Sequence, residues 1–464
     1  MADGDNSRGP VEQTSGAEAE PGTGAIPAWT PWRHPLFWVI LLGALVLRLG
    51  FVRFVTHPEL VRGQFEFYGD EYSYHCVAAT LAATGRYAEE PGDPLTAYRT
   101  PGFVLPLAGL YGLFGPLPAV GILWSVVCGV GLVVAMGWAG FALFGNHRAA
   151  LGAMALSAIL PSFVAYSALI MTDCLATLGA VVGMGALVNW ERERRWQTIA
   201  GAGLWMGWSY LARPSSGLML PLVLLWIWSA RPYWCALWHS AAFGAAVAAW
   251  VVPWTLRNYL ALGVLLPGTT AAGAMLWVSN NPLTAGLVQP VLPPELEGLQ
   301  VPRDYFLGGW ANREYLPPGM ATIPRGLSEW DQHKYYSREA VQFVRGHPVA
   351  VLRMDAYKVW RLIKGDEPVQ PRKMGQTGAR KGLNLRAMVG PLERWLVLAL
   401  GLVGLGRLLN RRRLFYLVGA FLLSAVVLVL IAYPSARFFM VGTSVLVLSA
   451  NGLLARGSPG GSDQ

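Results

Sequence analysis

The chain has 464 residues, of which 54% are hydrophobic and only 14% are charged, and 20 are tryptophan. Soluble globular proteins carry about 25% charged residues, so this composition excludes a soluble fold and predicts a membrane protein. The net charge of +9 does not indicate nucleic acid as a partner. The basic residues gather in short clusters between apolar runs, as the positive-inside rule expects.

Apolar runs close to the ~20 residues that cross the hydrocarbon core recur from Leu36 to Leu454. They predict an all-α polytopic protein with about ten transmembrane helices. The expected crossings are residues 36–55, 117–141, 149–166, 168–189, 198–212, 215–230, 236–256, 394–410, 413–432 and 437–454.

The segment 101–115 is also apolar, but it is short for a span and contains Pro101 and Pro106. If it does not cross, the basic clusters all fall on the same side as both termini. These clusters are Arg33-His34, His147-Arg148, 191–196, Arg231, 407–413 and Arg456. We therefore expect 101–115 to be a re-entrant or interfacial helix packed against protein. The loops 56–116 and 257–393 then face the non-cytoplasmic side.

This topology divides the chain into five parts. They are a cytoplasmic tail (1–30), a transmembrane core with the first outer loop (31–256), a large outer loop (257–393), C-terminal transmembrane helices (394–455) and a short tail (456–464). Both tails are expected to be disordered because their polar composition offers no apolar face. The first apolar run is expected to be a retained anchor rather than a cleaved signal peptide. Apolar and aromatic residues at helical spacing in 328–364, interrupted at Gly346-His347-Pro348, predict two amphipathic helices lying on the membrane or over a site.

The first outer loop contains the sequence GDEYSYH, with Asp70, Glu71 and His75. Gly69-Asp70 is typical of a helix start, so Asp70 is either a functional acid or only a helix cap. A metal site built from Asp70, Glu71 and His75 is a further alternative. Arg99, just before Pro101, either snorkels to the interface or binds an anionic lipid head group, because a guanidinium matches phosphate oxygens in bidentate fashion.

The four cysteines show no metal-like spacing and are expected to be ordinary small core residues. They are Cys76, Cys128, Cys174 and Cys235.

Further polar residues lie at the outer ends of the predicted spans. Asp173 falls about one and a half turns into the span 168–189, where a carboxylate does not face lipid. Pairing with Arg99 or Arg213 would satisfy it, and a catalytic role is the alternative. The other candidates are Arg213, Arg257, Asn258, Asn280, Asn281, Tyr433 and Arg437. Snorkelling alone would scatter charges over both faces, so this sorting predicts an outward-facing site for an anionic, lipid-attached substrate.

The motifs follow the order GDEYSYHCVAATLAATGRY, YRTPGFVLPLAGLYGLFG, SALIMTDCLATL, GWSYLARPSSGLMLP and PWTLRNYLALG with SNNP. In this order they resemble the GT-C superfamily of polyprenyl-phosphate-sugar glycosyltransferases. The nearest type is glycosyltransferase family 39, which includes protein mannosyltransferases and the aminoarabinose transferase acting on lipid A. The resemblance covers most of 36–285 and the stretch 328–364, whereas the last three spans match only in general character.

This resemblance implies a GT-C-like helical bundle and an inverting transfer from a lipid-phosphate sugar to an acceptor hydroxyl on the outer face. Asp70, with its neighbour Glu71, matches the family's catalytic base or acceptor-orienting acid. Arg99 matches the basic residue that holds the donor phosphate, where the lipid A transferase type has lysine. Arg213 and Arg257 would add to phosphate binding, and Asp173 would orient an arginine or the acceptor.

The expected partners are a polyprenyl-phosphate sugar, a lipid or glycan acceptor and membrane lipids, with no nucleic acid, no cofactor and no metal. The expected location is a bacterial inner membrane, with the site facing the periplasm or exterior. A transporter or flippase of a lipid-linked or anionic solute is the alternative function, because such proteins also need charges and broken helices. A third possible function is that of a scaffold that binds a lipid or a partner through 257–393. The chain shows no internal symmetry, and its polar residues favour one face rather than the bilayer midplane.

Overall fold

The computed structural model describes residues 29–58, 65, 67, 70–230, 232–281, 327–364, 385–432 and 437–455. Every regular element in these ranges is a helix, which confirms the all-α fold class predicted from the composition.

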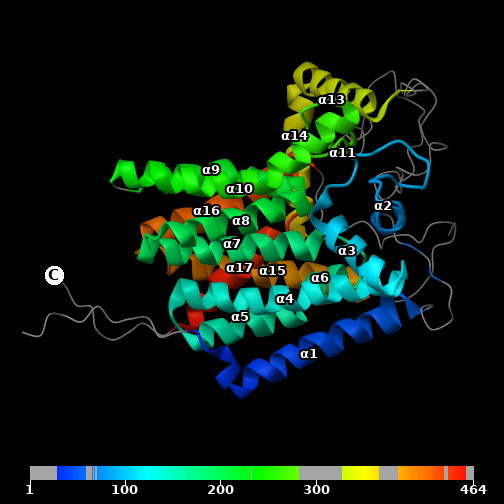
Figure 1. Cartoon of the computed structure of the whole chain (residues 1–464). Helices are drawn as coiled ribbons and strands as arrows, with labels where there is room; N and C mark the ends of the chain where they lie inside the picture. The colour runs from blue at the N-terminus through cyan, green and yellow to red at the C-terminus, as the bar shows by residue number, and fades with distance from the viewer. Residues whose placement is uncertain are drawn as a thin grey trace, which may run out of the picture.

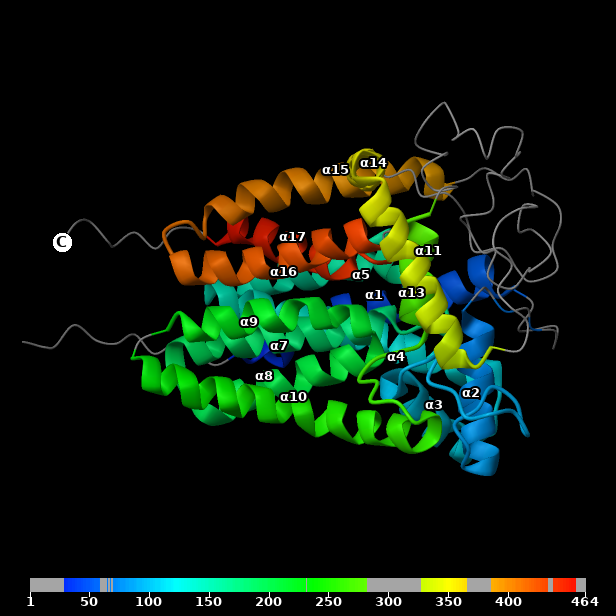
Figure 2. The ribbon, with the colours of Figure 1, turned by 90° about the horizontal axis from the view of Figure 1, so that it is seen from above.

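Most of the helices run side by side and form one elongated bundle (Figures 1 and 2). They are α1 (Pro35–Phe51), α4 (Pro118–Phe144), α5 (His147–Ile159), α7 (Asp173–Glu193), α8 (Trp196–Ala212), α9 (Met219–Trp228), α10 (Tyr233–Leu262), α15 (Leu385–Gly406), α16 (Arg412–Ile431) and α17 (Met440–Asn451). A second group of helices lies at one end of the bundle, which we call the capped end (Figure 1). This group is α2 (Glu71–Thr84), α3 (Pro101–Phe114), α11 (Ala271–Ser279), α13 (Glu329–Gly346) and α14 (Pro348–Lys364).

Five of the described helices are long and apolar enough to cross a membrane: α1 with its continuation to Thr56, α4, α7, α10 and α16. The bent pair of α5 and α6 (Pro161–Ser167) makes a sixth if it counts as one span. The chain is thus an integral membrane protein, although fewer helices meet this requirement than the number of crossings expected. Several predicted spans combine a helix with a turn. In 215–230, for example, the 3₁₀ turn Pro214–Leu218 leaves only 10 residues for α9.

One predicted span is broken between α5 and α6 (Pro161–Ser167), which are bent by 61°. The proline at the start of α6 cannot donate the hydrogen bond that would continue α5. Arg48 of α1 is fully buried and donates to the carbonyls freed at the end of α5, those of Ser157 (3.4 Å) and Ala158 (3.1 Å). The sequence did not mark Arg48 as important, yet this side chain satisfies a helix end inside the bundle.

The start of α7 differs from the prediction. Asp173 is its first residue, with Thr172 as the N-cap, so the expected position one and a half turns inside a span is wrong. The preceding turn is held by Glu71, whose Oε1 accepts a hydrogen bond from the backbone N–H of Ile170 at 2.7 Å. The Asp173 carboxylate consequently lies at the positive N-terminal end of α7, where a negative charge is stabilised.

The segment 101–115 forms the short helix α3 at the capped end, beside α2 (Figures 1 and 2). Its first turn packs tightly on the end of α8. A Cβ atom added at Gly102 would lie 2.3 Å from the backbone nitrogen of Ala212. Because α3 begins here, this close approach fixes the position of Arg99, three residues upstream.

The two helices predicted in 328–364 are α13 and α14, with the break at His347. Glu329, at the start of α13, accepts from the backbone N–H of Ala97 at 2.9 Å and from the Thr270 hydroxyl. Lys358 of α14 is buried and donates to Asp355 (2.9 Å) and to the Leu430 carbonyl at the end of α16 (2.6 Å). These contacts tie α13 and α14 to the first outer loop and to the bundle.

Candidate functional site

Five charged side chains meet at the capped end, and each comes from a helix terminus or the residues beside one. Asp70 is the N-cap of α2, Asp173 begins α7 and Arg213 is the C-cap of α8. Arg99 and Arg437 lie in the segments that lead into α3 and α17. All five were candidates from the sequence, and we call them the ion network.

Asp70 is bound by two arginines, one on each carboxylate oxygen. Arg99 Nη2 lies 2.8 Å from Asp70 Oδ1, and Arg437 Nη1 lies 2.7 Å from Oδ2. Although Asp70 occupies the N-cap position of α2, its side chain makes no capping hydrogen bond. The interpretation of Asp70 as only a helix cap therefore does not describe its side chain.

Asp173 continues the ion network on its other side. Its Oδ1 accepts from Arg437 Nε at 3.2 Å and from Arg213 Nη1, so Arg437 bridges the two acids. The Asp173 side chain is fully buried. Of the two arginine partners expected for it, Arg213 is the one that the structure shows.

The ion network contains three arginines and two aspartates, which leaves one positive charge in excess. Burial alone would raise the pKa of Asp70, but the guanidiniums of Arg99 and Arg437 hold it well below its usual range. Burial alone would lower the pKa of Arg99, yet the Asp70 carboxylate raises it above its ordinary value. Asp70 and Arg99 are therefore both charged at neutral pH.

Aromatic side chains hold two of the arginines in place. The Arg99 guanidinium lies 4.5 Å from the centre of the Tyr74 ring and donates to Ser73 Oγ at 3.1 Å. Arg213 lies 4.6 Å from the ring centre of Phe438. Cation–π contacts of this kind fix a guanidinium while leaving its charge available. Tyr74 and Phe438 were not singled out in the sequence, because an aromatic residue beside a span is too common to indicate a site.

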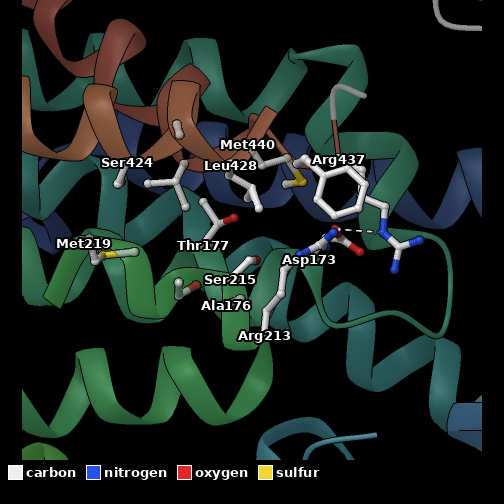
Figure 3. A pocket seen from close by; sticks show the side chains of 14 residues that line it. Asp173, Ala176, Thr177, Arg213, Ser215, Met219, Ser424, Leu428, Arg437 and Met440 are labelled. Atoms are coloured by element: carbon white, nitrogen blue, oxygen red, sulfur yellow. Dashed lines mark hydrogen bonds and ion pairs between the residues drawn. The ribbon is translucent and has the colours of Figure 1, made fainter. Parts of the chain in front are cut away.

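A small pocket with a cavity volume of about 20 Å³, partly open to solvent, lies next to the Asp173 side of the ion network (Figure 3). One end is charged and carries Asp173, Arg213 and Arg437. The rest is lined by small and apolar residues of α7, α9, α16 and α17 and of the turn before α9: Ala176, Thr177, Ser215, Ser216, Met219, Ser424, Ala425, Leu428, Phe438, Met440 and Val441. The pocket thus offers cations at one end and a mostly apolar lining between helices at the other.

The side chains of Glu71 and His75 contact residues outside the ion network. The Glu71 carboxylate is fully buried and lies 3.4 Å from His57 Nε2, in addition to its bond with Ile170. His75 Nδ1 is 2.8 Å from the Tyr111 hydroxyl, and burial lowers the pKa of this histidine. Within the described part of the chain, no three His, Cys, Asp or Glu side chains are placed to share a metal ion. The alternative of a metal site at Asp70, Glu71 and His75 therefore has no geometric support.

Arg257 and Asn258 lie within α10, which continues to Leu262 beyond the end predicted for that span. Arg257 donates to the backbone carbonyls of Thr96 (2.7 Å) and Tyr87 (3.1 Å), so it holds the first outer loop. Asn258 donates to the Leu266 carbonyl at 2.8 Å. Both residues support the loops around the ion network and are not members of it.

Asn280 and Asn281 follow α11. Asn280 donates to the carbonyls of Leu276 (2.9 Å) and Ile431 (3.2 Å), and Asn281 donates to that of Trp277 (2.8 Å). The structure does not bring either amide into the ion network. Tyr433 lies outside the described residues.

The cysteines match the expectation in part. Cys128 and Cys174 are buried and Cys76 is half-buried, but Cys235 is exposed near the start of α10. The sequence does not distinguish an exposed position in an apolar helix at the edge of the bundle from a core position, because apolar residues flank both.

No family model and no curated protein matches the chain. Among solved structures it is similar to the archaeal oligosaccharyltransferase AglB from Archaeoglobus fulgidus in complex with an inhibitory peptide and a dolichol-phosphate, with a TM-score of 0.53 and 14% identity over 92% of this chain and 51% of that one. A second structure, of the Archaeoglobus fulgidus oligosaccharyltransferase tethered to an acceptor peptide, gives a TM-score of 0.54 and 14% identity over 92% of this chain and 50% of that one. ArnT from Cupriavidus metallidurans bound to undecaprenyl phosphate gives 0.40 and 15% identity over 92% and 78% of the two chains.

The chain spans about half the length of the two oligosaccharyltransferase chains. At such low identity these likenesses show the fold alone. The GT-C-like helical bundle predicted from the sequence is thus supported as a fold, and the resemblance seen in the motifs stays a prediction.

Proposed function

We propose that the chain is a membrane glycosyltransferase. It transfers a sugar from a polyprenyl-phosphate donor to an acceptor hydroxyl on the non-cytoplasmic face, with inversion at the anomeric carbon. The observation that carries this proposal is the ion network of Asp70, Arg99, Asp173, Arg213 and Arg437 beside a pocket that is charged at one end and apolar at the other.

The pocket suits the donor in both of its parts. Arg213 and Arg437 line its charged end, and guanidinium groups bind phosphate oxygens in a bidentate fashion. A lipid phosphate would add negative charge where the ion network has one positive charge in excess. The apolar residues of α9, α16 and α17 would receive the first part of the polyprenyl chain. The fold adds to this argument, since the oligosaccharyltransferase AglB, which shares it, is described in complex with a dolichol-phosphate.

Asp70 is the proposed base. In the transfer, the acceptor oxygen attacks the anomeric carbon from the face opposite the phosphate, and its proton passes to the Asp70 carboxylate. The bond between the anomeric carbon and the phosphate oxygen breaks, and its electron pair leaves with the polyprenyl phosphate. The arginines stabilise the negative charge that develops on that leaving phosphate.

The pairing of Asp70 with two arginines makes it a poor base before the donor binds, because its pKa is held well below the usual range. A donor phosphate competes with Asp70 for Arg99 and Arg437. Drawing either guanidinium toward the phosphate raises the pKa of Asp70 and frees a carboxylate oxygen for the acceptor hydroxyl. The proposal therefore includes an order of events, in which the donor binds first.

Asp173 has a supporting role in this scheme. It is fully buried and holds both Arg213 and Arg437, which orients the two guanidiniums at the mouth of the pocket. Glu71 supports the same region through the Ile170 turn that precedes α7.

The proposed orientation rests on charge. Exposed arginines gather at the end of the bundle opposite the ion network, at Arg192, Arg194, Arg195, Arg407, Arg411 and Arg412. Because cytoplasmic loops carry the excess of basic residues, we place this end in the cytoplasm and the capped end outside.

The test is incubation of the purified full chain, in detergent or liposomes, with a panel of polyprenyl-phosphate sugars and acceptor lipids, followed by quantification of released polyprenyl phosphate. The wild type should release it, and Asp70→Asn should abolish release while still binding the donor. Asp331→Asn is the matched control, because Asp331 is a partly exposed acid on α13 at the same end, outside the ion network. Asp70→Asn with wild-type turnover would exclude Asp70 as the base. Absence of release by the wild type with every donor, together with movement of the lipid between leaflets, would favour the transporter alternative.

A further inference from the structure

A second hollow lies at the end of the bundle opposite the ion network, between the end of α7 and the turn that joins α15 to α16. It is lined by Glu191, Arg192, Asn410, Arg411, Arg412, Arg413 and Leu414. We call it the arginine hollow. It contains four arginines and one acid. The bundle helices that form it run away from the capped end (Figure 1), so the arginine hollow is separate from the proposed transfer reaction.

The single acid is already used within the protein. Glu191 Oε1 accepts from Arg413 Nε at 2.5 Å and from Arg194 Nη2 at 2.9 Å. Arg413 also donates to the Ser229 hydroxyl at 2.8 Å and lies 4.9 Å from the ring centre of Trp226. Arg413 and Glu191 therefore build the floor of the arginine hollow and leave little negative charge for the other arginines.

The remaining arginines are only weakly compensated, because Glu193 beside Arg192 attracts that guanidinium without forming an ion pair with it. Arg192 and Arg412 are exposed, and neither makes a hydrogen bond or ion pair with another residue in the described part of the chain. Arg411 donates to the Leu143 carbonyl at 3.1 Å and lies close enough to Arg192 for the two charges to repel. Converging guanidiniums that outnumber the acids near them repel one another, and an anion bound among them would reduce that repulsion.

Aromatic residues place the arginine hollow at the level of the lipid head groups. Trp196 at the start of α8, Trp228 at the end of α9 and Tyr416 in the first turns of α16 are 62%, 48% and 63% exposed. Exposed Trp and Tyr at the ends of spans mark the membrane–water interface. An anion at this depth is most readily supplied by a lipid of the surrounding leaflet, where basic clusters attract anionic head groups.

We infer that the arginine hollow binds the phosphate of an anionic phospholipid from the leaflet at that end of the bundle. Arg192, Arg411 and Arg412 would hold the phosphate oxygens, with Arg413 and Glu191 as the fixed floor. The acyl chains would lie along the exposed apolar surface of α16 beside Tyr416. The bound lipid would contact both the α7–α8 and the α15–α16 connections. It would thereby stabilise the end of the bundle opposite the capped end.

The experiment is a lipid titration of the purified full chain in detergent, followed by native mass spectrometry, with phosphatidylglycerol and phosphatidylcholine as the probes. The variant R192Q/R412Q removes two of the proposed ligands. The matched control is R195Q/R407Q, which removes two exposed arginines from the same two connections but outside the arginine hollow. We expect the wild type to retain phosphatidylglycerol over phosphatidylcholine, and R192Q/R412Q to weaken its binding about tenfold or more. R195Q/R407Q should weaken it less than about threefold.

Equal weakening by the two double variants would overturn the proposal, because it would show attraction by the total charge rather than a site. Equal retention of the two lipids by the wild type would overturn it as well. A further arm adds inorganic phosphate: if low millimolar phosphate displaces the phosphatidylglycerol, the arginine hollow takes free anions and the assignment to a lipid fails. If R192Q/R412Q does not fold, the single variants R192Q and R412Q are compared with R195Q and R407Q in the same way.

Discussion

Arg437 joins the last part of the chain to the first outer loop, with its Nη1 2.7 Å from Oδ2 of Asp70. The same guanidinium reaches Asp173 through Nε at 3.2 Å. The two acids therefore share one arginine that sits at the entrance to α17. Arg437 therefore couples the two acids. A movement of α17, or an anion bound to the Arg437 guanidinium, would change the charge around both Asp70 and Asp173.

Replacement of Arg437 is the most direct test of this coupling between the two acids. Arg437→Gln removes a cation at the developing phosphate charge and should lower kcat/KM for sugar transfer about 100-fold or more. Arg437→Lys keeps the charge but cannot reach both acids at once, so it should recover only part of the loss. Rates of polyprenyl phosphate release measure both variants. Arg345→Gln, an exposed arginine near the end of α13, serves as the control and should be unaffected. Full activity of Arg437→Gln would contradict the scheme.

Asp173 should matter for stability as well as for activity. Its side chain is fully buried between Arg213 and Arg437, so Asp173→Asn leaves two guanidiniums without their counter-charge. Breaking a buried ion pair from one side costs about 3–5 kcal/mol. Thermal unfolding in detergent should show a clear loss for Asp173→Asn and a much smaller one for Asp331→Asn, whose contacts with Lys334 and Ser328 are at the surface. The double variant D173N/R213Q should lose less than the sum of the single changes, because the two residues interact directly. Additive losses would argue against a coupled ion network.

The sequence predicted the members of the ion network from one physical fact, which is that charge near hydrocarbon is expensive. Asp70, Arg99, Asp173, Arg213 and Arg437 all meet that criterion and all converge. The criterion failed to separate them from residues that use the same polarity for structure. The guanidinium of Arg257, for example, donates hydrogen bonds to backbone carbonyls of the first outer loop. Backbone carbonyls are available along the whole chain, so the sequence does not reveal which arginine will find one.

Packing details were the other part that the sequence could not provide. The break between α5 and α6 follows from Pro161, but the carbonyls that Arg48 satisfies there become visible only when α1 and α5 are side by side. Several of the predicted crossings are not single long helices for a related reason. Hydropathy does not distinguish one long helix from a short apolar helix preceded by a turn, as in 215–230.

The ion network gives stability a defined dependence on pH. The folded-state pKa of Asp70 is held well below its usual range by Arg99 and Arg437. A depressed carboxyl pKa stabilises the folded state above the ordinary value near 4 and loses this contribution as the pH falls further. The difference in melting temperature between wild type and Asp70→Asn should therefore be constant from pH 8 to about pH 5 and shrink below about pH 4. A difference that grows on acidification would contradict the assigned pairing.

The close approach of α3 to α8 is the last feature that can be tested, and α3 itself offers the control. A Cβ atom at Gly102 would lie 2.3 Å from Ala212 N, whereas one at Gly109 meets no atom within 4 Å. Gly102→Ala should therefore destabilise the protein by about 1–3 kcal/mol, as overpacking does. Gly109→Ala should be neutral or stabilise α3 by up to about 1 kcal/mol, because alanine loses less backbone entropy in a helix. Thermal unfolding measures both changes. Because α3 follows Arg99 directly, Gly102→Ala should also reduce sugar transfer in the protein that remains folded, by moving this arginine away from Asp70. If both variants melt like the wild type, α3 is not held against α8 in the membrane, and the position of Arg99 must be set by its contacts with Tyr74 and Ser73 instead.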